Sequence, residues 1–352
     1  MIILVINPGS TSTKMAVVKD GEPLLIRTIR HAAEELAPFA KITDQLEFRR
    51  NLILEELAKA EIPVEFDAIV ARGGLTKPIP GGVYAVNETM INATMESVHH
   101  HACDLGCVIA DSIAKKIGCP SYIADPAVTD ELNDYARVCG SPMFKRLPMW
   151  HALNQRAIAR RFAKEHGKRY EDLNLIVCHL GGGISVAAHE HGKAVDVNNA
   201  LDGEGPFSPE RAGTLPAGDI IRACFSGKYT QQELLKSLSG NAGVNAHLGT
   251  TDMLEAGRRI EAGDEHAKLI IDSMIYHIAK AIGSQAPVLC GKIDAILITG
   301  GIAHWKYLID RLLPRIEFLA PVHIYPGEDE MSALAANAAA ALRGEVETQE
   351  YK

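Results

Sequence analysis

Several signals that would assign a protein to a particular class are missing from this chain of 352 residues. It has no long run of Lys and Arg, and its formal net charge is −8. The concentrated cationic face that nucleic acids and anionic membrane surfaces require is therefore not expected. No stretch approaches the roughly 18 apolar residues of a membrane-spanning helix. These absences argue against both a nucleic-acid-binding protein and a membrane protein.

Cysteine usage gives no sign of a disulfide framework. The seven cysteines are odd in number, and no two of them form a CxxC pair. This favours free thiols in a reducing cytoplasm. The apolar run Met1–Ile6 has no preceding basic residues and is too short for a secretory signal, so it is predicted to be a buried strand. We therefore expect a cytoplasmic protein.

The chain is well supplied with material for buried cores. Apolar residues make up 47% of it and charged residues 23%, which are the proportions of a soluble globular protein. Its length predicts about two domains. No low-complexity linker separates the halves, so we expect a cleft between them rather than a flexible tether.

A pattern of three short strands separated by two glycine-containing turns occurs twice. In the first half the strands are predicted at 2–6, 13–18 and 24–29, and in the second half at 175–179, 184–188 and 194–198. A repeated unit of this size indicates two similar domains, each with a sheet. The remaining pattern predicts helices over 44–60, 90–118, 265–284 and 332–342, strands at 68–71, 121–124 and 295–298, and a polar tail.

The turn after the first strand has the composition of a phosphate-binding loop. It reads Asn7-Pro-Gly-Ser-Thr-Ser-Thr-Lys14. Glycine lets backbone N–H groups approach a phosphate, Ser10 and Ser12 add hydroxyl donors, and Lys14 supplies charge. The GxxxxGK[ST] spacing of a Walker A loop is absent. The alternative interpretation is a hairpin turn rich in turn-forming residues.

Two more glycine motifs follow predicted strands in the second half. In His179-Leu-Gly181-Gly182-Gly183 the glycines remove side chains from a turn, which suits the close approach of a nucleotide. A flexible hairpin is the alternative. Thr299-Gly300-Gly301 could wrap an adenosine, although loops between strands and helices use glycine routinely.

Four polar residues lie in Gly- or Pro-rich segments of the kind that build sites at strand ends. They are Arg72, Asp125, His151 and Arg211. Two arginines suit a carboxylate and a transferring phosphoryl group. The alternative for each residue alone is a surface ion pair or a satisfied core position.

A separate cluster has the spacing of metal ligands. His99, Cys103 and Cys107 would share one face of a helix. No second ligand pair follows at zinc-ribbon spacing. A polar start to a helix is the alternative, and the sequence leaves the choice open.

Taken together, these segments resemble the family of acetate and butyrate kinases within the actin-like ATPase superfamily. The Asn7–Lys14 segment and His179–Gly183 are similar to its two phosphate loops, and the resemblance covers essentially the whole chain. The segments Asp125-Pro-Ala-Val-Thr-Asp-Glu, Trp150-His151 and Glu210-Arg211-Ala-Gly occur in the family's order. The Arg72-Gly-Gly-Leu-Thr-Lys-Pro segment and the chain length resemble the butyrate and branched-chain subgroup.

The resemblance implies an α/β fold of two similar actin-like (ribonuclease-H-like) domains, each a mixed sheet flanked by helices, with a cleft between them. Residues 1–147 together with 332–352 would form the substrate and phosphate domain, and residues 148–331 the nucleotide-binding domain. A homodimer or higher homo-oligomer is also implied.

The resemblance also implies roles for single residues. Arg72 would bind the substrate carboxylate and Asp125 would orient or deprotonate the acceptor. His151 and Arg211 would stabilise the transferring phosphoryl group. Mg²⁺ would be held by Asn7 and Glu330, with Asp329 as the neighbouring alternative. Nucleotide contacts would come from Asn7, Ser10, Ser12, Lys14, His179, Gly181, Gly182, Gly183, Asp252, Gly300 and Gly301.

The expected activity is reversible transfer of a phosphoryl group from MgATP to the carboxylate of butyrate or a similar short-chain or branched fatty acid, giving an acyl phosphate and ADP. Two alternative functions also belong to the actin-like superfamily: a kinase of hydroxyl acceptors, and an ATP-driven conformational protein that hydrolyses ATP slowly. A third alternative is a metal-binding regulatory protein. The preferred acyl chain and the physiological direction are outside what the sequence predicts.

Overall fold

The computed structural model describes residues 1–74, 77–96 and 102–352, and it divides into two compact units. Unit 1 comprises Met1–Thr129 and Asp329–Lys352, and unit 2 comprises Asp130–Glu328. The contacts therefore divide the chain after residue 129 and again after residue 328, whereas the sequence analysis divided it after residues 147 and 331.

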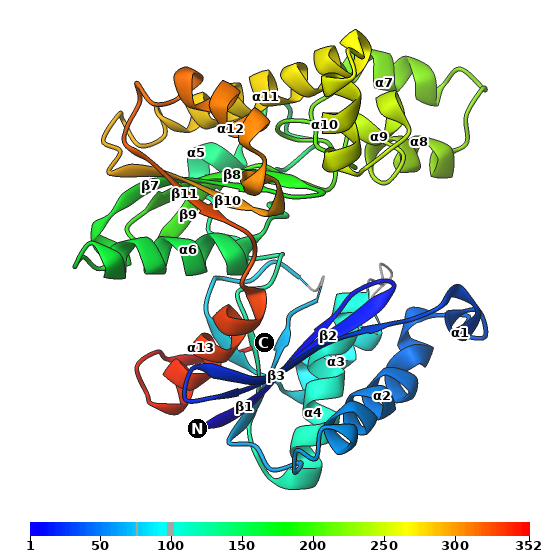
Figure 1. Ribbon diagram of the computed structural model, residues 1–352, viewed down its shortest axis with the longest axis vertical. Coiled ribbons are helices and arrows are strands. Elements are labelled where there is room, and N and C mark those ends of the chain that lie inside the picture. Colours follow the sequence, from blue (N-terminus) through cyan, green and yellow to red (C-terminus); the bar gives the residue numbers. More distant parts are fainter. Residues whose placement is uncertain (75–76, 97–101) are drawn as a thin grey trace. The chain divides into compact units, whose positions relative to one another are not determined.

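Unit 1 is built on a seven-stranded mixed sheet in the order β12-β5-β6-β4-β1-β2-β3 (Figure 1). β1, β2 and β3 form an antiparallel meander, whereas β1, β4 and β6 run parallel. β5 is antiparallel to β6, and β12 pairs parallel with β5. The strands are β1 (Ile2–Pro8), β2 (Ser12–Lys19), β3 (Glu22–Arg30), β4 (Ala68–Arg72), β5 (Val83–Ala85), β6 (Ser121–Ala124) and β12 (Thr348–Glu350).

Helices cover both faces of this sheet. α2 and α4 bury Ile53, Leu57 and Ile109 against Leu4 and Ile6 of β1, and α13 contacts β1 and β4. Because both faces are covered, β1 is an almost continuous buried apolar run. The helices are α1 (Ala33–Leu36), α2 (Leu46–Lys59), α3 (Glu88–Met95), α4 (Leu105–Ile117) and α13 (Glu330–Leu342), with 3₁₀ turns η1 (Ile42–Gln45) and η2 (Ala102–Asp104).

Unit 2 is built on a five-stranded sheet in the order β11-β10-β7-β8-β9. β7, β8 and β9 repeat the antiparallel meander of unit 1, and β10 joins β7 and β11 in parallel. The strands are β7 (Asn174–Leu180), β8 (Ile184–Glu190), β9 (Lys193–Val197), β10 (Ala295–Gly300) and β11 (Val322–Pro326).

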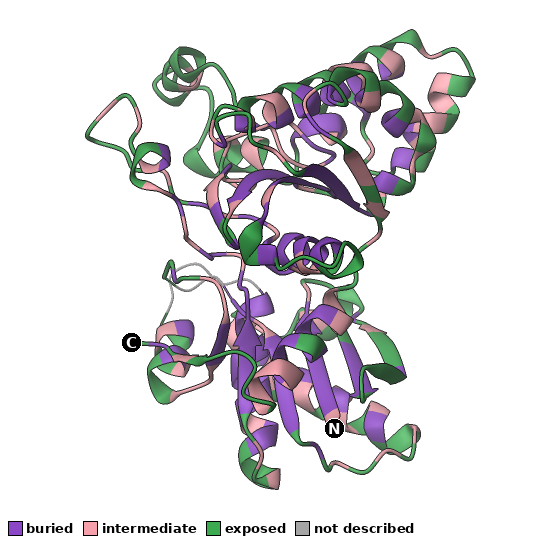
Figure 2. Cartoon of the chain, turned by 90° about the vertical axis from the view of Figure 1, so that its left-hand side faces the viewer, coloured by how far each residue is buried: buried purple, intermediate pink, exposed green. Residues whose placement is uncertain are grey.

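Alternate residues of β7 enter two different cores, which places a helical layer on each face of the sheet. Leu175 and Val177 pack with Phe162 of α6, and Ile176 and Cys178 lie in the cluster around α11 and α12. Figure 2 shows the central strands as almost wholly buried. The helices are α5 (Asp134–Arg137), α6 (Ala152–Glu165), α7 (Ala217–Cys224), α8 (Gln231–Leu238), α9 (Gly243–Leu248), α10 (Met253–Glu261), α11 (Glu265–Gln285) and α12 (Lys306–Leu312), with 3₁₀ turns η3 (Tyr170–Asp172), η4 (Gly301–His304) and η5 (Leu313–Arg315).

The structure confirms the two predicted meanders and the polar tail, and it corrects one other prediction. The single helix expected over 90–118 is wrong, because α3 ends at Met95 and α4 begins at Leu105. Within the polar tail, residues 348–350 form β12 at the edge of the sheet. The Gln349 side-chain amide also donates to the Gly81 carbonyl at 2.9 Å.

Two further observations concern the cysteines and the helices. None of the seven cysteines, all of which lie in the described ranges, forms a disulfide. Among the residues that the structure describes, no helix combines the length and the apolar character needed to cross a membrane.

Candidate functional site

The β1–β2 loop presents the residues of the first predicted phosphate motif. Asn7 and Lys14 are opposite each other in the β1–β2 register. Asn7 is buried, Ser12 is half-buried, and Ser10 and Lys14 are exposed. A backbone hydrogen bond of 2.7 Å from the Gly9 N–H to the Ser12 carbonyl closes the turn. The loop therefore has an exposed rim of hydroxyl and ammonium groups above a buried base.

Arg49 of α2 forms the base of this loop, and the sequence analysis missed it. Its guanidinium donates to the carbonyls of Gly9 at 2.8 Å, Ser12 at 3.1 Å and Ser10 at 3.2 Å. It also donates to the Thr13 hydroxyl at 3.0 Å. The side chain is fully buried, and burial lowers the pKa of Arg49 to about 10. An arginine in an amphipathic helix is expected on the exposed face, so no local sequence signal identified Arg49 as a buried residue.

Glu330, Asn7 and Arg72 form a polar cluster in unit 1. The Asn7 amide Nδ2 donates to Glu330 Oε2 at 2.6 Å, and Arg72 Nη1 lies 3.2 Å from Glu330 Oε1. Asp329 is instead the N-cap of α13, where its Oδ1 accepts from the Ser332 N–H at 3.2 Å. Of the acidic pair, the carboxylate beside Asn7 is therefore that of Glu330.

Asp125 follows β6 at the same carboxyl edge of the parallel strands. Its strand neighbour Ala124 pairs with Arg72 of β4. The backbone has a positive φ of 40° at Asp125, which is uncommon outside glycine. Asp125 Oδ1 accepts from the Gly82 N–H at 2.8 Å, and the Asp125 N–H donates to the Gly82 carbonyl at 3.0 Å. This buried carboxylate thus joins the end of β6 to the start of β5.

His151 and His179 form a stacked pair in unit 2. Their ring centroids are 3.8 Å apart and their planes differ by 12°. His151 precedes α6, and its Nδ1 lies 2.8 Å from the Ser185 hydroxyl. His179 is the penultimate residue of β7. Its Nδ1 lies 2.8 Å from Asn154 Oδ1, and its Nε2 lies 3.0 Å from Glu328 Oε1 but outside hydrogen-bond geometry.

The triple-glycine loop packs against the segment that carries Arg211. The Ser208 hydroxyl and the Glu210 N–H both donate to the Gly182 carbonyl, at 2.6 and 3.1 Å. A Cβ on Gly182 would lie 3.3 Å from the Glu210 carboxylate. The Arg211 guanidinium donates to the Glu210 carbonyl at 3.2 Å and to its carboxylate at 3.3 Å. The backbone carbonyl of Gly182 therefore joins the two loops.

The third glycine motif has a packing explanation at one of its two positions. Gly300 has φ of 93°, and a Cβ there would come within 2.3 Å of the Leu180 carbonyl, so β10 can pass the end of β7 only with glycine. Gly301 faces open space. Asp252 is the N-cap of α10, and its Oδ1 accepts from the Leu254 N–H at 2.8 Å.

The predicted residues thus form two groups, one in each unit. Asn7, Arg72, Glu330 and Asp125 lie at the carboxyl edge of the parallel strands of unit 1, where α/β proteins hold ligands. His151, His179, Gly181–Gly183 and Arg211 surround the β7–β8 turn of unit 2. Asp252 and Gly301 belong to other elements of unit 2.

The proposed His/Cys cluster is only partly described. His99 lies outside the described residues, as do Leu75 and Thr76 of the segment that follows Arg72. Burial raises the pKa of Cys103 to about 12 and that of Cys107 to about 11. Within the described ranges, no group of three His, Cys, Asp or Glu side chains could hold a metal ion.

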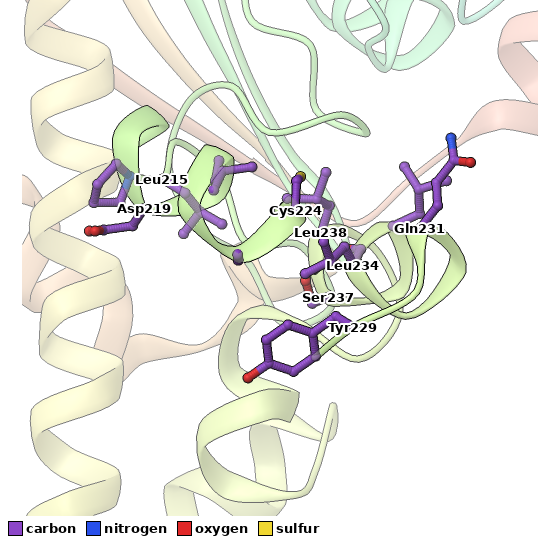
Figure 3. A pocket seen from close by; sticks show the side chains of 12 residues that line it. Leu215, Asp219, Cys224, Tyr229, Gln231, Leu234, Ser237 and Leu238 are labelled. Carbon is purple, nitrogen blue, oxygen red and sulfur yellow. Dashed lines mark hydrogen bonds between the residues drawn. The ribbon is translucent and has the colours of Figure 1, made fainter. Parts of the chain in front are cut away.

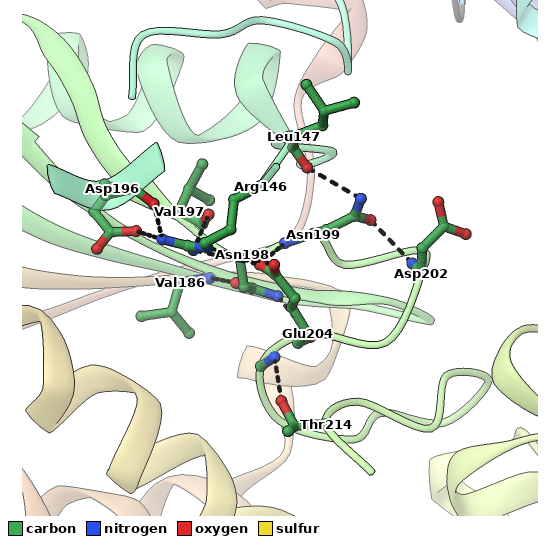
Figure 4. Close-up of polar contacts among 12 residues, drawn as sticks. Arg146, Leu147, Val186, Asp196, Val197, Asn198, Asn199, Asp202, Glu204 and Thr214 are labelled. Carbon is green, nitrogen blue, oxygen red and sulfur yellow. Dashed lines mark hydrogen bonds and ion pairs between the residues drawn. The ribbon is translucent and has the colours of Figure 1, made fainter. Parts of the chain in front are cut away.

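Two other features of unit 2 differ in chemistry from these groups. An apolar hollow of about 610 Å³ lies between α7 and α8, lined by Ile220, Cys224 and Leu234 among others (Figure 3). Arg146 binds Asp196 at 3.0 Å and Glu204 at 3.3 Å (Figure 4). Because every donor of this guanidinium has a protein partner, we interpret the Arg146 network as structural: it holds the segment after β9 in place.

Comparison with known proteins places the chain among carboxylate kinases. The model of the acetokinase family matches residues 148–321. The chain is 62% identical over 353 residues to a probable butyrate kinase of Bacteroides thetaiotaomicron, covering 100% of both. It is 50% identical to butyrate kinase 2 of Clostridium acetobutylicum, covering 99% of both.

Solved structures agree with the fold. The acetate kinase of Porphyromonas gingivalis superposes with a TM-score of 0.79 at 19% identity, over 97% of this chain and 99% of that one. A propionate kinase from Francisella tularensis gives 0.73 at 18% identity, over 96% and 98%. The class of protein is thus an ATP-dependent carboxylate phosphotransferase with the actin-like fold, as the resemblance predicted.

Within that class, the chain belongs to the acetokinase family. Its full-length relatives at 50% identity and above are named butyrate kinases. Membership argues against the two superfamily alternatives, a kinase of hydroxyl acceptors and a non-catalytic conformational ATPase.

Proposed function

We propose that this enzyme phosphorylates butyrate or a similar short-chain or branched acid with MgATP, and that it also runs in reverse to make ATP. The observation that carries the proposal is the cluster of Arg72, Asn7 and Glu330 at the carboxyl edge of β1 and β4. A guanidinium in this position suits a carboxylate substrate, which an arginine can bind through two parallel hydrogen bonds. The acyl chain length is supported by the full-length relatives, which are named butyrate kinases.

The residues present fit a magnesium ion. Mg²⁺ in kinases takes one or two protein carboxylates together with phosphate oxygens of the nucleotide. Glu330 offers a carboxylate and Asn7 an amide oxygen, and the 2.6 Å hydrogen bond between them holds the pair in one place. When bound, the ion would offset negative charge on the phosphates. We propose Glu330 rather than Asp329 as the ligand, because Asp329 caps α13.

The transfer we propose needs no strong base. A carboxylate oxygen of the acid, already ionised at neutral pH, forms a bond to the γ-phosphorus while the bond to the β–γ bridging oxygen breaks and ADP leaves. The enzyme therefore acts by positioning and by charge stabilisation. Arg211 and His151 would donate to the phosphoryl oxygens, and Ser10, Ser12, Lys14 and the 181–183 loop would hold the nucleotide phosphates. Asp125 would act by holding the strand ends around the acid.

Trapping the acyl phosphate with hydroxylamine tests this proposal. With MgATP and straight-chain acids from two to six carbons, we expect the yield of hydroxamate to peak near four carbons. Selectivity should be shallow, since one methylene is worth about 1–3 kcal/mol. Arg72→Ala should raise KM for the acid by about 10–100-fold, because this change in KM corresponds to the free energy of one hydrogen bond to a charged group. KM for ATP should change little.

Arg27→Ala is a suitable control for Arg72→Ala. Arg27 is an exposed arginine of β3, and its nearest carboxylate oxygen, on Glu56, is 3.9 Å away. Its removal should leave both KM values unchanged. The absence of hydroxamate with every acid would contradict the proposed reaction, and an unchanged acid KM in Arg72→Ala would remove Arg72 from the acid site.

We also propose that the enzyme forms a homo-oligomer through the surface of α7 and α8. Neither helix buries a side chain, and Phe225 is 87% exposed, Ile221 59% and Leu235 53%. An exposed apolar patch of this kind is typical of a protein–protein contact. Sedimentation velocity should show a dimer or larger species, which Phe225→Asp shifts toward monomer. A monomer in the unaltered protein would contradict the proposal.

A further inference from the structure

A buried chain of hydrogen bonds runs from His151 into the core of unit 2. His151 Nδ1 lies 2.8 Å from the Ser185 hydroxyl, which accepts from Gln155 Nε2 at 2.8 Å. Gln155 Oε1 lies 3.1 Å from His189 Nε2, and His189 Nδ1 lies 2.5 Å from the Tyr170 hydroxyl. Ser185, Gln155 and His189 are completely buried, and Tyr170 is 4% exposed. None of these four residues was among the predicted site residues.

One backbone carbonyl fixes the direction of the whole chain. Gln155 Nε2 also lies 3.1 Å from the Ser185 carbonyl oxygen, which can only accept hydrogen bonds. The nitrogen end of the Gln155 amide must therefore face Ser185, because the flipped amide would bring two acceptors together. It follows that Oε1 faces His189 and that His189 carries its proton on Nε2.

The His189–Tyr170 end of these hydrogen bonds agrees with this direction. With its proton on Nε2, neutral His189 uses Nδ1 to accept from the Tyr170 hydroxyl. Burial lowers the pKa of His189 to about 3, with the positive charges of Arg156 and Arg160 adding to the effect. His189 is therefore neutral at any working pH, and it can donate only toward Gln155.

The near end determines the proton position on His151. The Ser185 hydroxyl accepts from Gln155 Nε2 at 2.8 Å and, more weakly, from the His151 N–H at 3.4 Å. Both of its lone pairs are then used, so its own proton goes to His151 Nδ1. His151 accepts there and carries its proton on Nε2. Its ring also stacks on that of His179, with the ring centroids 3.8 Å apart.

We propose that Ser185, Gln155, His189 and Tyr170 are positioning residues that hold His151 as the neutral Nε2–H tautomer, so that its Nε2–H donates to the transferring phosphoryl group. The inference rests on the proposed function only for the identity of the acceptor. In the other tautomer, Nε2 would present a lone pair to a phosphoryl oxygen. These four residues therefore make His151 a hydrogen-bond donor without requiring the ring to be positively charged; we call them the relay. In other enzymes too, the hydrogen-bond partner of one ring nitrogen fixes the tautomer of a catalytic histidine.

Nitrogen NMR of the full chain labelled with ¹⁵N-histidine measures the tautomer directly. The His151 signals are assigned by their loss in His151→Gln. In the unaltered protein we expect an unprotonated, pyridine-type Nδ1 and a protonated, pyrrole-type Nε2. A protonated Nδ1, or a mixture of tautomers, would overturn the proposal. This spectrum requires no variant of the relay, so the test stands even if a variant fails to fold.

Two variants then test whether the relay sets the tautomer. Ser185→Ala removes the donor to Nδ1. Gln155→Met leaves the Ser185–His151 contact in place, but it frees the Ser185 hydroxyl to accept from a protonated Nδ1. Both should add the Nδ1–H tautomer and lower kcat by about 10-fold, the usual effect of losing an outer hydrogen-bond partner, with KM for ATP within about twofold. A role limited to packing would leave the tautomer unchanged in Gln155→Met.

Ser121→Ala is the matched control, because Ser121 is also a buried strand serine whose hydroxyl makes a hydrogen bond, to Asp111 in unit 1. It should change neither the tautomer nor kcat. An unchanged His151 spectrum in both relay variants would overturn the inference. A changed tautomer with unaltered kcat would support the relay and contradict the role of His151 in phosphoryl transfer.

Discussion

Arg211→Ala should lower kcat by about 10²–10³-fold, the usual effect of removing one donor that stabilises a transition state. The expected loss is large because the guanidinium would bind the phosphoryl group most strongly in the transition state, where the negative charge is redistributed. The effect should appear in kcat more than in KM for either substrate. Steady-state kinetics with hydroxylamine trapping measures it.

The same variant should fold normally. The Arg211 guanidinium donates only to its neighbour Glu210 among the described residues, whereas the Arg211 backbone holds the turn through Ser208. Truncation to alanine keeps that backbone, so we expect the free energy of unfolding to change by less than about 1 kcal/mol. Arg169→Ala is the control: it removes an exposed arginine of unit 2 that lies 3.6 Å from Glu171, and it should leave kcat unaltered. A kcat of Arg211→Ala within fivefold of the unaltered enzyme would contradict the assigned role.

Arg49→Met should destabilise unit 1 by about 4 kcal/mol and raise KM for ATP. Methionine fills a similar volume, but the carbonyls of Gly9 and Ser10 lose the guanidinium as donor, and the Ser12 carbonyl keeps only the Gly9 N–H. Each buried acceptor that loses its donor typically costs about 1–3 kcal/mol, and this guanidinium serves three carbonyls of the loop. Urea denaturation measures the loss of stability, and the loop disorder that follows should weaken nucleotide binding.

Two further substitutions make this result interpretable. Arg49→Lys keeps the charge but not the fork of donors, so it should recover only part of the lost stability. Lys59→Met removes an exposed cation at the end of the same helix and should cost less than about 0.5 kcal/mol. If Arg49→Met were as stable as Lys59→Met, the buried guanidinium would have no part in shaping the loop.

Much of the fold could be predicted from local patterns. The two meanders were found because glycine-containing turns separate their consecutive strands, and α11 because its apolar residues repeat at helical spacing. β12 could not be found in this way, since Thr348–Glu350 is a short polar edge strand defined by its partner β5. α7 and α8 were also missed, and neither helix buries a side chain in a core.

The candidate site was predictable where a motif identifies the chemistry. Glycine next to hydroxyls and a lysine marked the β1–β2 loop, and Glu330 followed from resemblance alone. The structure adds that Asn7 and Glu330, 323 residues apart in sequence, are hydrogen-bonded partners. No sequence motif marks Arg49 or the hydrogen-bonded Ser185, Gln155 and His189, because their roles depend on which acceptors surround them in the folded protein. The site roles themselves stay predictions until the kinetic tests are made.

The division of unit 1 between the two ends of the chain has a consequence for synthesis on the ribosome. Unit 2 is one continuous stretch and can fold as soon as residues 130–328 have emerged. Unit 1 must wait for Asp329–Lys352, which supply α13 and β12. Until then the first-made strands lack the helix that contacts β1 and β4, and an apolar sheet face stays exposed to water. The usual order, in which N-terminal domains fold first, is therefore reversed. Nascent chains that stall before residue 329 should be the ones that chaperones bind and that aggregate.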